Sequence, residues 1–589
     1  MNDSRSSSSV NNGLLPRLAL SEWIVFIVLA AVIAAANIYT TLLIGWGDGG
    51  SIVAVLGAVL MLGWMGRTRP SVYTLNLGQT LVSAGGSIGF AVASYAAVYI
   101  AEPEFNPSST RLVLMFICMG MFGTIVGTSV RRQMVSYFFP SGTACAVIQR
   151  AVTKELAPGE RNRPVFLLKL WGGIAGLLTI PTKITMTAGG APLIGNLSLW
   201  PSKGIGLGVD PLFYGIGIVV GPKVGAGMLL GALSVPFWIQ PALASSPDAS
   251  VGDWVKWSAI ALLTLPTFAT IIFAYFFRTA PVVPTGFTPG ATTYNAPAGK
   301  SLLQGTVGIL AAVGIAITAN LVFDLPLFVT IVTIAIAWPL CVVNGRVTGD
   351  TDINPVRLLA IVLLSGFFWM VDGTVTTLLG MAVIGGTLAS VAVDMMQDYR
   401  TGYLLDQDSN HQTVVQFVGV VAGSLAAIPT LNMLIGKLGI GEGSALAAPG
   451  AVIWASMADA MRSGFSPSNS LLLAIGIISV VGCGYAYLTV WPKTAKWMPS
   501  LFGAGIGMLV GVEASAAIFV GGLIKSFVVG GYTNGKSGAE KAKAADDGGN
   551  DTMLAGASVF AAGAILSIVL VLLTTIFDVL DMDVFHIGH

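Results

Sequence analysis

The sequence predicts an all-α polytopic integral membrane protein with about 16 transmembrane helices in two similar halves. Composition is the first reason, because 54% of the 589 residues are apolar and only 10% are charged, with a mean hydropathy of +0.81. A soluble protein carries about 25% charged residues, so this chain has too few charges to cover a surface in water. The other two reasons are a series of long apolar runs and an internal repeat.

The apolar runs are long enough to cross a lipid bilayer, which takes about 20 mainly apolar residues. The run that starts at Trp23 is too long for the apolar part of a signal peptide, so we expect it to be retained as the first span. The Ser- and Asn-rich residues 1–20 before it are predicted to be a disordered N-terminus. The expected spans are 22–44, 50–65, 72–100, 110–130, 164–182, 206–222, 224–243, 255–278, 301–322, 325–345, 356–373, 375–393, 412–436, 467–490, 497–524 and 552–578.

Two further apolar pieces are too short to span and are interrupted by proline. They are FFPSGTACAVIQR at 138–150 and ALAAPGAVIWASMADAM at 445–461. Irregular backbone survives in a bilayer only inside protein or beside a watery cavity, so both are predicted to be re-entrant or broken helices. If the first piece dips in and returns, Arg131 and Arg150 lie on one side, which the positive-inside rule makes the cytoplasm together with the N-terminus.

An internal repeat supports the two halves. The segment from Tyr214 to Leu233 aligns without gaps on the segment from Ala504 to Leu523, and eight of the 20 positions are identical. Two similar halves, each with a broken helix, are typical of secondary transporters. We therefore expect an N-terminal half at 21–295, a C-terminal half at 296–578 that contains a polar cytoplasmic loop at 531–551, and a tail at 579–589.

Two enzyme-like patterns lack the context that their chemistry needs. Residues Gly530–Ser537 read G-x-x-x-x-G-K-S, but a phosphate-binding loop follows a buried strand, and here an apolar helix precedes it. Residues Gly85–Gly89 read G-x-S-x-G inside an apolar helix, with no histidine in an apolar run to serve Ser87. We expect neither an ATP pump nor a membrane-embedded enzyme, although the latter stays open as a less favoured alternative.

Charged residues inside apolar spans are the first candidates for a transport site, because they are costly there and so tend to be functional. Glu513 and Lys223 occupy equivalent positions of the repeat, and Glu513 is the leading proton-coupling candidate. Lys223 could attract an anionic group or pair with Glu513. Asp372 is the second proton-coupling candidate. Asp394 and Asp398 are expected at the membrane interface, because they lie near a basic segment.

Polar groups in and beside the helices are the other candidates. The backbone around Ser141, Gly142 and Thr143 follows Pro140, and a helix N-terminus favours anionic groups such as a peptide carboxylate. Ser141 could equally be only a helix cap. The substrate-pathway candidates are Asn37, Asn76, Gln79, Ser141, Gly142, Thr143, Lys223, Asn354, Pro449 and Gly450.

No cofactor or metal site is predicted, because the four cysteines are far apart and the three histidines form no cluster. The net charge is only +1, and we expect no nucleic-acid partner.

Several stretches resemble the oligopeptide transporter (OPT) superfamily, in particular its bacterial branch, which is related to the yellow-stripe-like transporters. The likeness extends from about residue 18 to 575, and the most specific piece resembles a D-x-[KR]-TGYLL loop. One departure is ALAAPGAVIW, where Gly450 stands at a position at which the family commonly has glutamine. The resembling segments are AAANIYTTLLIGWGDGGSI, YTLNLGQTLVSAGGSIG, YFFPSGTACAVIQR, DPLFYGIGIVVGPKVGAGMLLGALSVPFWIQPAL, GDTDINPVRLL and QDYRTGYLLDQD.

The resemblance implies a proton-coupled importer of small peptides or peptide-like solutes. It leaves open a second cargo class, which is the complex of a metal with a peptide-like or amino-acid-derived chelator. The character of the motifs implies a bacterial inner membrane. The two similar halves, each with a broken helix, are consistent with this and predict alternating access between the halves.

Overall fold

The protein is described here from a computed structural model. The described residues are 16–45, 51–66, 70–153, 162–185, 191–244, 250–277, 302–351, 354, 356, 363, 374–441, 443–463, 468–489, 491–495, 498–579 and 586–587.

Among the described residues, 12 helical segments are long and apolar enough to cross a membrane, and three shorter apolar helices accompany them. The all-α class is therefore confirmed, while the figure of 16 spans stays a prediction. The structure also contains two small antiparallel sheets of two strands. One pairs β1 (Ile184–Thr185) with β4 (His586–Ile587), and the other pairs β2 (Leu197–Trp200) with β3 (Ile205–Leu207).

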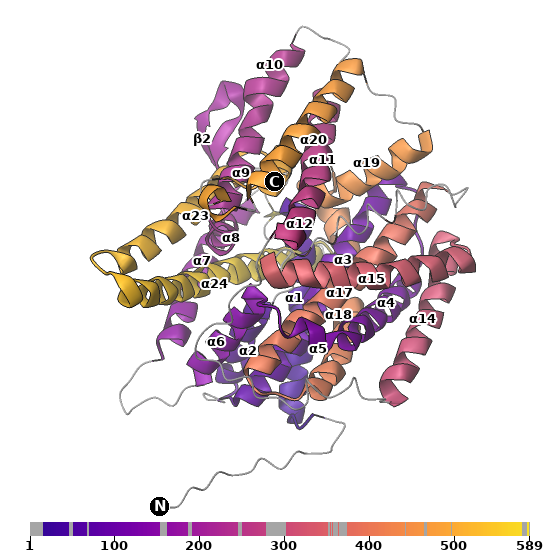
Figure 1. Cartoon of the computed structure of the whole chain (residues 1–589), viewed down its shortest axis with the longest axis vertical. Helices are drawn as coiled ribbons and strands as arrows, with labels where there is room; N and C mark the ends of the chain where they lie inside the picture. Colours follow the sequence, from indigo (N-terminus) through magenta and orange to yellow (C-terminus); the bar gives the residue numbers. More distant parts are fainter. Residues whose placement is uncertain are drawn as a thin grey trace, which may run out of the picture.

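The first of two helix bundles is built around a pair of 30-residue helices, α3 (Val72–Ala101) and α17 (Val375–Leu404), which pack on each other and are almost wholly buried. It occupies the lower part of Figure 1. Around the pair lie α1 (Leu20–Ile44), α2 (Ser51–Trp64), α4 (Ser109–Ser129), α5 (Arg131–Met134), α6 (Pro140–Thr153), α14 (Leu302–Phe323), α15 (Leu327–Thr351), α18 (Ser409–Leu438) and α19 (Pro449–Ser463).

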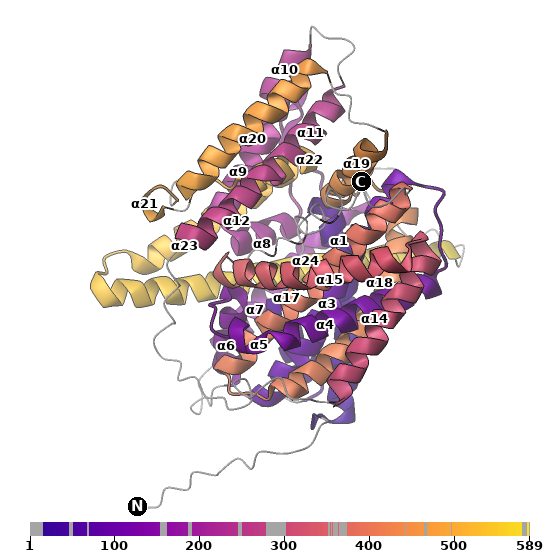
Figure 2. The same cartoon turned by 45° about the vertical axis from the view of Figure 1, so that its right-hand side comes forward.

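The second bundle gathers the later helices of each half, many of which lie in the upper part of both views (Figures 1 and 2). The two bundles meet where α24 packs on α1 and α2. The members of the second bundle are α7 (Arg163–Lys183), α8 (Pro211–Val220), α9 (Pro222–Ser234), α10 (Gln240–Leu243), α11 (Val251–Leu263), α12 (Leu265–Phe277), α20 (Asn469–Thr489), α21 (Pro492–Ala495), α22 (Leu501–Val510), α23 (Val512–Thr533) and α24 (Gly538–Val579).

The halves repeat one another in three dimensions. α8 packs on α23, and its counterpart α22 packs on α9. Likewise α24 covers α7 and α8, while α11 and α12 cover α20 and α11 covers α22. Elements from the N-terminal half thus make the same contacts as elements about 300 positions later, which supports the division of the chain into two similar halves.

The helix breaks in this repeat differ from expectation. Residues 497–524 were expected to form one span, but the chain breaks at Gly511 between α22 and α23. Gly221 breaks the chain equivalently between α8 and α9. The two glycines have φ of 95° and 84° with ψ near 175°, a backbone conformation that is essentially restricted to glycine. The expected span 206–222 is wrong for the same reason, because α8 has only 10 residues.

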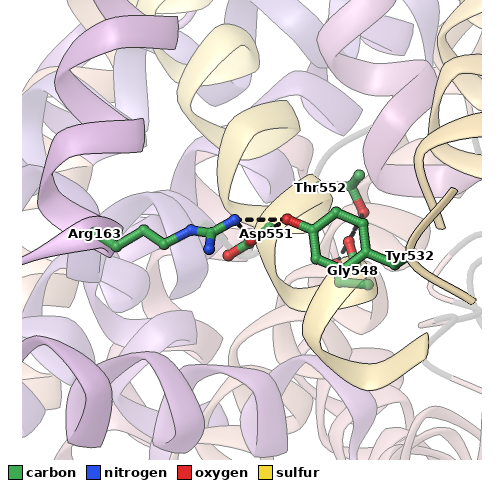
Figure 3. Close-up of polar contacts among 6 residues, drawn as sticks. Arg163, Tyr532, Gly548, Asp551 and Thr552 are labelled. Carbon is green, nitrogen blue, oxygen red and sulfur yellow. Dashed lines mark hydrogen bonds and ion pairs between the residues drawn. The ribbon is translucent and has the colours of Figure 1, made fainter. Parts of the chain in front are cut away.

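The expected polar loop at 531–551 is largely helical. α23 continues to Thr533, and α24 already begins at Gly538, because residues 539–545 read AEKAKAA and consist only of residues that favour helices. The end of α23 and the N-terminal part of α24 are both tied to the start of α7, as Figure 3 shows. Arg163 Nη2 lies 2.6 Å from Asp551 Oδ2, and the Tyr532 hydroxyl donates to the same carboxylate at 2.7 Å.

Glycine lets the helices of the repeat approach very closely. A Cβ atom on Gly217 would lie 2.0 Å from the Ile518 carbonyl oxygen, and one on Gly507 would lie 1.9 Å from the Met228 carbonyl oxygen. These contacts are equivalent in the two halves, since both pairs are offset by 290 positions. Such close backbone approach is how small residues hold membrane helices together.

We expect Gly217→Ala to lower the free energy of unfolding by about 1–3 kcal/mol, because the added methyl group forces two backbones apart. The measurement is the thermal unfolding of purified protein in detergent. Gly173→Ala in α7 is the matched control, since nothing lies within 4 Å of its Cβ position. Equal unfolding temperatures for the two variants would contradict the close contact.

Candidate transport site

The two short helices expected from the sequence are present and begin in the same unusual way. α6 has 14 residues and α19 has 15, or about 21–23 Å, which is too short to cross the hydrocarbon core. The residues before their first prolines, Phe139 and Ala448, have φ of 42° and 44°. This region is unfavourable for residues other than glycine, so the surroundings must hold the backbone there.

Backbone hydrogen bonds to other helices hold these two positions. The Phe139 N–H donates to the Gly349 carbonyl of α15 at 2.8 Å, and the Ala448 N–H donates to the Leu42 carbonyl of α1 at 2.6 Å. Each helix start is thus fixed by a long helix beside it. Thr143 donates through its hydroxyl to the Phe138 carbonyl at 2.5 Å, which places its side chain in the entry turn.

The start of α6 docks on α17. The Thr401 hydroxyl donates to the Gly142 carbonyl at 2.9 Å. A Cβ atom on Gly142 would lie 2.7 Å from the Gln397 carbonyl oxygen. Gly142 therefore serves close helix packing, whereas Ser141 beside it is half-buried.

The start of α19 borders a small hollow between α19, α1 and α3. The expected residue Gly450 lines it, and two buried polar atoms there, Thr41 Oγ1 and Trp454 Nε1, have no hydrogen-bond partner among the described residues. The indole can only donate, and the first N–H groups of a helix also point outward as free donors. The hollow is lined by Thr41, Leu42, Phe90, Ala93, Ser94, Ala448, Gly450, Ala451 and Trp454.

A seam of buried polar side chains runs through the first bundle where α3, α17 and α18 meet. Asp394 and Asp398 lie in this seam and are 3% and 0% exposed. The expectation that they lie at the membrane interface stays a prediction, whereas the loop expected around TGYLL is wrong, because α17 continues to Leu404. The basic segment near them is folded into the same helix and does not mark its end.

The side chains that donate to Asp398 in the described part of the chain are neutral. Gln79 Nε2 and the Ser83 hydroxyl of α3 donate to its two carboxylate oxygens, the latter at 2.6 Å. From α18, Gln412 Nε2 donates to the Asp398 backbone carbonyl at 2.9 Å and to Thr80 Oγ1 at 3.1 Å. One turn earlier on α17, Asp394 Oδ2 accepts from Gln416 Nε2 at 3.4 Å.

Sequence reasoning named Gln79, one member of this cluster, as a candidate. It did not name Asp398, the carboxylate to which Gln79 donates, as a candidate. A signal was present, because Asp394 and Asp398 are four residues apart and so lie on one face of a helix. Gln412 and Gln416 have the same spacing. What the sequence alone could not show is that the two faces point at each other and at α3.

The other polar candidates lie in the same bundle at separate points. Asn37 Nδ2 donates to the Gly86 carbonyl at 3.0 Å, and Asn354 Nδ2 donates to the Ala389 carbonyl at 3.5 Å. Asn76 is fully buried, and neither of its amide atoms has a partner in the described part of the chain. Asp372 lies outside the described residues.

Glu513 and Lys223 lie at the breaks of the repeat, where each is the second residue of a half-helix. Asn196 Nδ2 donates to the Glu513 carboxylate, and Lys223 Nζ donates to the Ala495 carbonyl at 2.7 Å. No ion pair found among the described residues joins the two. Glu513 is partly exposed and Lys223 is exposed. Glu513 follows directly on the break at Gly511, so the expectation that it lies within one unbroken span is wrong.

One buried ion pair in the second bundle was not anticipated, and a hydrogen bond connects it to the first bundle. Lys183 Nζ at the end of α7 lies 2.7 Å from Asp210 Oδ2, with side-chain exposures of 15% and 7%. The same ammonium donates to the Tyr39 hydroxyl of α1 at 3.0 Å. Asp210 also caps α8 by accepting from the Leu212 N–H at 2.9 Å. A single cluster thus connects α1, α7 and α8.

Comparison with known proteins identifies the family of this chain. The model of the OPT oligopeptide transporter protein family matches residues 18–575. The chain belongs to the OPT family. Members of this family are membrane transporters and not enzymes, and the 12 candidate spans agree with a multi-pass membrane protein. In agreement with this, Gly530–Ser537 lies over the end of α23 and the turn before α24, and not after a strand.

Curated relatives match over part of the chain. "Probable metal-nicotianamine transporter YSL9" of Oryza sativa is 27% identical over 31% of this chain and 27% of its own length. "Metal-nicotianamine transporter YSL2" of Arabidopsis thaliana is 26% identical over 31% of this chain and 28% of its own. "Putative oligopeptide transporter YGL114W" of Saccharomyces cerevisiae is 23% identical over 34% and 29%. The matched region thus spans less than a third of these relatives.

We expect Lys183→Met and Asp210→Asn each to lower the free energy of unfolding by about 3–5 kcal/mol, because each leaves one buried charge without its partner. The double variant should lose less than the sum of the two, as measured by denaturation in detergent. Asparagine still caps α8, so the cap is preserved.

Asp253→Asn is the control for this pair, since Asp253 is 52% exposed in its ion pair with Lys256. It should cost no more than about 1 kcal/mol. Strictly additive losses in the double variant would show that Lys183 and Asp210 do not interact.

Proposed function

We propose that this OPT protein is a secondary active transporter that imports small oligopeptides or peptide-like solutes by alternating access, coupled to protons. We further propose a location in a bacterial inner membrane with the N-terminus in the cytoplasm. The family membership supports transport as the function. The hollow at the start of α19 is the observation from which we infer the substrate class.

The hollow presents donors without acceptors. Trp454 Nε1 is a buried donor that has no partner in the described structure, and it lies beside the first turn of α19. The positive end of a helix dipole favours a negatively charged group at this position. The group that suits such donors is a carboxylate, which every peptide carries at its C-terminus. Gly450 leaves this approach free of a side chain.

The second cargo class is a metal bound to a peptide-like or amino-acid-derived chelator. The names of the relatives YSL9 and YSL2 favour it. Among the described residues, no group of three or more His, Cys, Asp or Glu side chains could hold a metal ion. The metal would therefore travel with its chelator, whose carboxylates could use the same donors as a peptide.

The two-bundle architecture supports alternating access. Each half contributes helices to both bundles, and each half contains a short broken helix and a glycine break. The bundles meet through α24 and through the Lys183–Asp210–Tyr39 cluster. Motion of one bundle against the other around a central site is how such repeats operate.

The test is uptake into proteoliposomes from a defined pool of short peptides and metal chelates, read by mass spectrometry with and without an imposed proton gradient. We expect gradient-dependent accumulation of a peptide or a chelate. In the same assay Glu513→Gln tests the carboxylate that the repeat singles out, which should abolish accumulation if it carries the proton. Accumulation that follows a sodium gradient instead would overturn proton coupling.

We expect Trp454→Phe to reduce uptake of the transported member of the pool about ten-fold, because the variant keeps the ring but loses the indole donor, and a hydrogen bond to a charged group is worth about 1.5–3 kcal/mol. The loss should appear in the apparent affinity. Trp64→Phe is the control, since Trp64 is 93% exposed. Unchanged affinity in Trp454→Phe would remove the hollow from substrate recognition.

A further inference from the structure

We infer that Asp398, and not Glu513, is the carboxylate whose protonation drives the transport cycle. This inference rests on the proposed proton-coupled transport and deepens it. It concerns a side chain buried in the first bundle at the meeting point of α3, α17 and α18, far from the glycine breaks that carry Glu513 and Lys223.

Burial is the first argument. Asp398 is 0% exposed, and no ion pair in the described part of the chain involves it. A carboxylate is costly to bury in a medium of low dielectric unless charge or hydrogen bonds compensate for it. Its partners, Gln79 and Ser83, are neutral. A carboxyl group surrounded by neutral hydrogen-bonding groups can be accommodated with or without its proton.

The partners suit both protonation states, which is the second argument. When Asp398 is ionised, Gln79 Nε2 and the Ser83 hydroxyl donate to it. Gln79 Oε1 is buried and has no partner in the described structure. If the Gln79 amide turns over, this oxygen accepts the proton of a neutral Asp398 carboxyl group. One glutamine can thus serve the site before and after protonation.

The charged and titratable groups on the surrounding elements are engaged elsewhere. On α17, Arg400 Nη1 donates to the Val135 carbonyl at 2.7 Å, and Asp394 accepts from Gln416. Arg150 of α6 donates to the Leu404 carbonyl, and His411 of α18 lies 3.2 Å from the Tyr73 hydroxyl of α3. Arg131 lies beside Tyr399. Asp398 is therefore not paired with the cations around it.

The position of Asp398 on α17 connects it with both broken helices. The start of α6 docks at Gln397 and Thr401, which flank Asp398 within one turn. Twelve residues earlier, about 18 Å along the helix, a Cβ atom on Gly386 would lie 3.0 Å from the Trp454 ring of α19. α17 thus carries the carboxylate of Asp398, and it contacts both the entry turn of α6 and the tryptophan that borders the hollow.

Protonation would act through this helix. In the ionised state, α3 is tied to α17 by two charge-assisted hydrogen bonds, and such bonds are about twice as strong as neutral ones. Uptake of a proton weakens this tie and changes the balance between two arrangements of α17 relative to α3. Because α6 and α19 both pack on α17, the change reaches each broken helix.

The first experiment uses Asp398→Asn, which keeps the shape and both neighbours but cannot ionise. In proteoliposomes loaded with the same defined pool of peptides and chelates, we expect the variant to lose proton-driven accumulation at least ten-fold. It should retain exchange of internal for external solute at equal pH, because exchange needs no net proton movement. Asp253→Asn is the matched control and should keep its proton-driven accumulation, because that carboxylate is 52% exposed. Glu513→Gln in the same assay decides between the two candidate carboxylates.

A second experiment depends on no substrate. Infrared difference spectra of the purified protein between about pH 5 and 8 should show the carbonyl band of a buried carboxyl group that is missing in Asp398→Asn. Ser83→Ala removes one donor to the ionised form, so the pH midpoint of this band should rise by about one unit. If Asp398 has a purely structural role, it keeps one protonation state, and the wild-type protein shows no such band change over this pH range.

The outcomes separate the two proposals. Proton-driven accumulation that persists in Asp398→Asn, or a band midpoint that Ser83→Ala leaves unchanged, would overturn the assignment of Asp398 while transport stands. A wild-type protein that accumulates nothing from the pool would overturn the proposed transport function, and the infrared titration would still decide whether Asp398 exchanges a proton. If Asp398→Asn does not fold, Ser83→Ala decides the assignment.

Discussion

The structure depends on one constraint, which is that a polar group inside the bundle must find its partner within the protein. Water is absent from a bilayer core, so each unsatisfied group costs several kcal/mol. In the first bundle this requirement ties α3, α17 and α18 together through amides, hydroxyls and one carboxylate. The same bonds fix the rotation of α17 about its axis, because only one face of that helix carries Asp394 and Asp398.

Close backbone contact provides the rest of the cohesion. Apolar side chains gain little from leaving lipid for protein, so membrane helices associate through small residues that let backbones approach. The glycines within α8, α9, α22 and α23 have this role, whereas Gly221 and Gly511 break the chain between these helices and have open space at their Cβ positions. A broken helix leaves free backbone N–H and C=O groups in the membrane, and such groups can bind solute or hold a neighbouring helix.

These two kinds of contact lie in different parts of the molecule. The polar seam lies in the first bundle, and the glycine breaks lie in the second, while Lys183, Asp210 and Tyr39 connect them. Glu513 at a glycine break and Asp398 in the seam are thus different kinds of carboxylate. The first is partly exposed and held by Asn196, and the second is buried and held by α3.

The sequence by itself determined the membrane class, the two halves, the two short broken helices and the family, because hydropathy, proline positions and repeated motifs are properties of the linear chain. It also pointed to Gln79 and to the repeat glycines. It treated residues 394–404 and the largely helical residues 531–551 as lying outside helices, and it placed Glu513 within one unbroken span. Only the tertiary structure decided these points, because whether a polar residue faces lipid, water or another helix depends on how helices far apart in the chain rotate and pack.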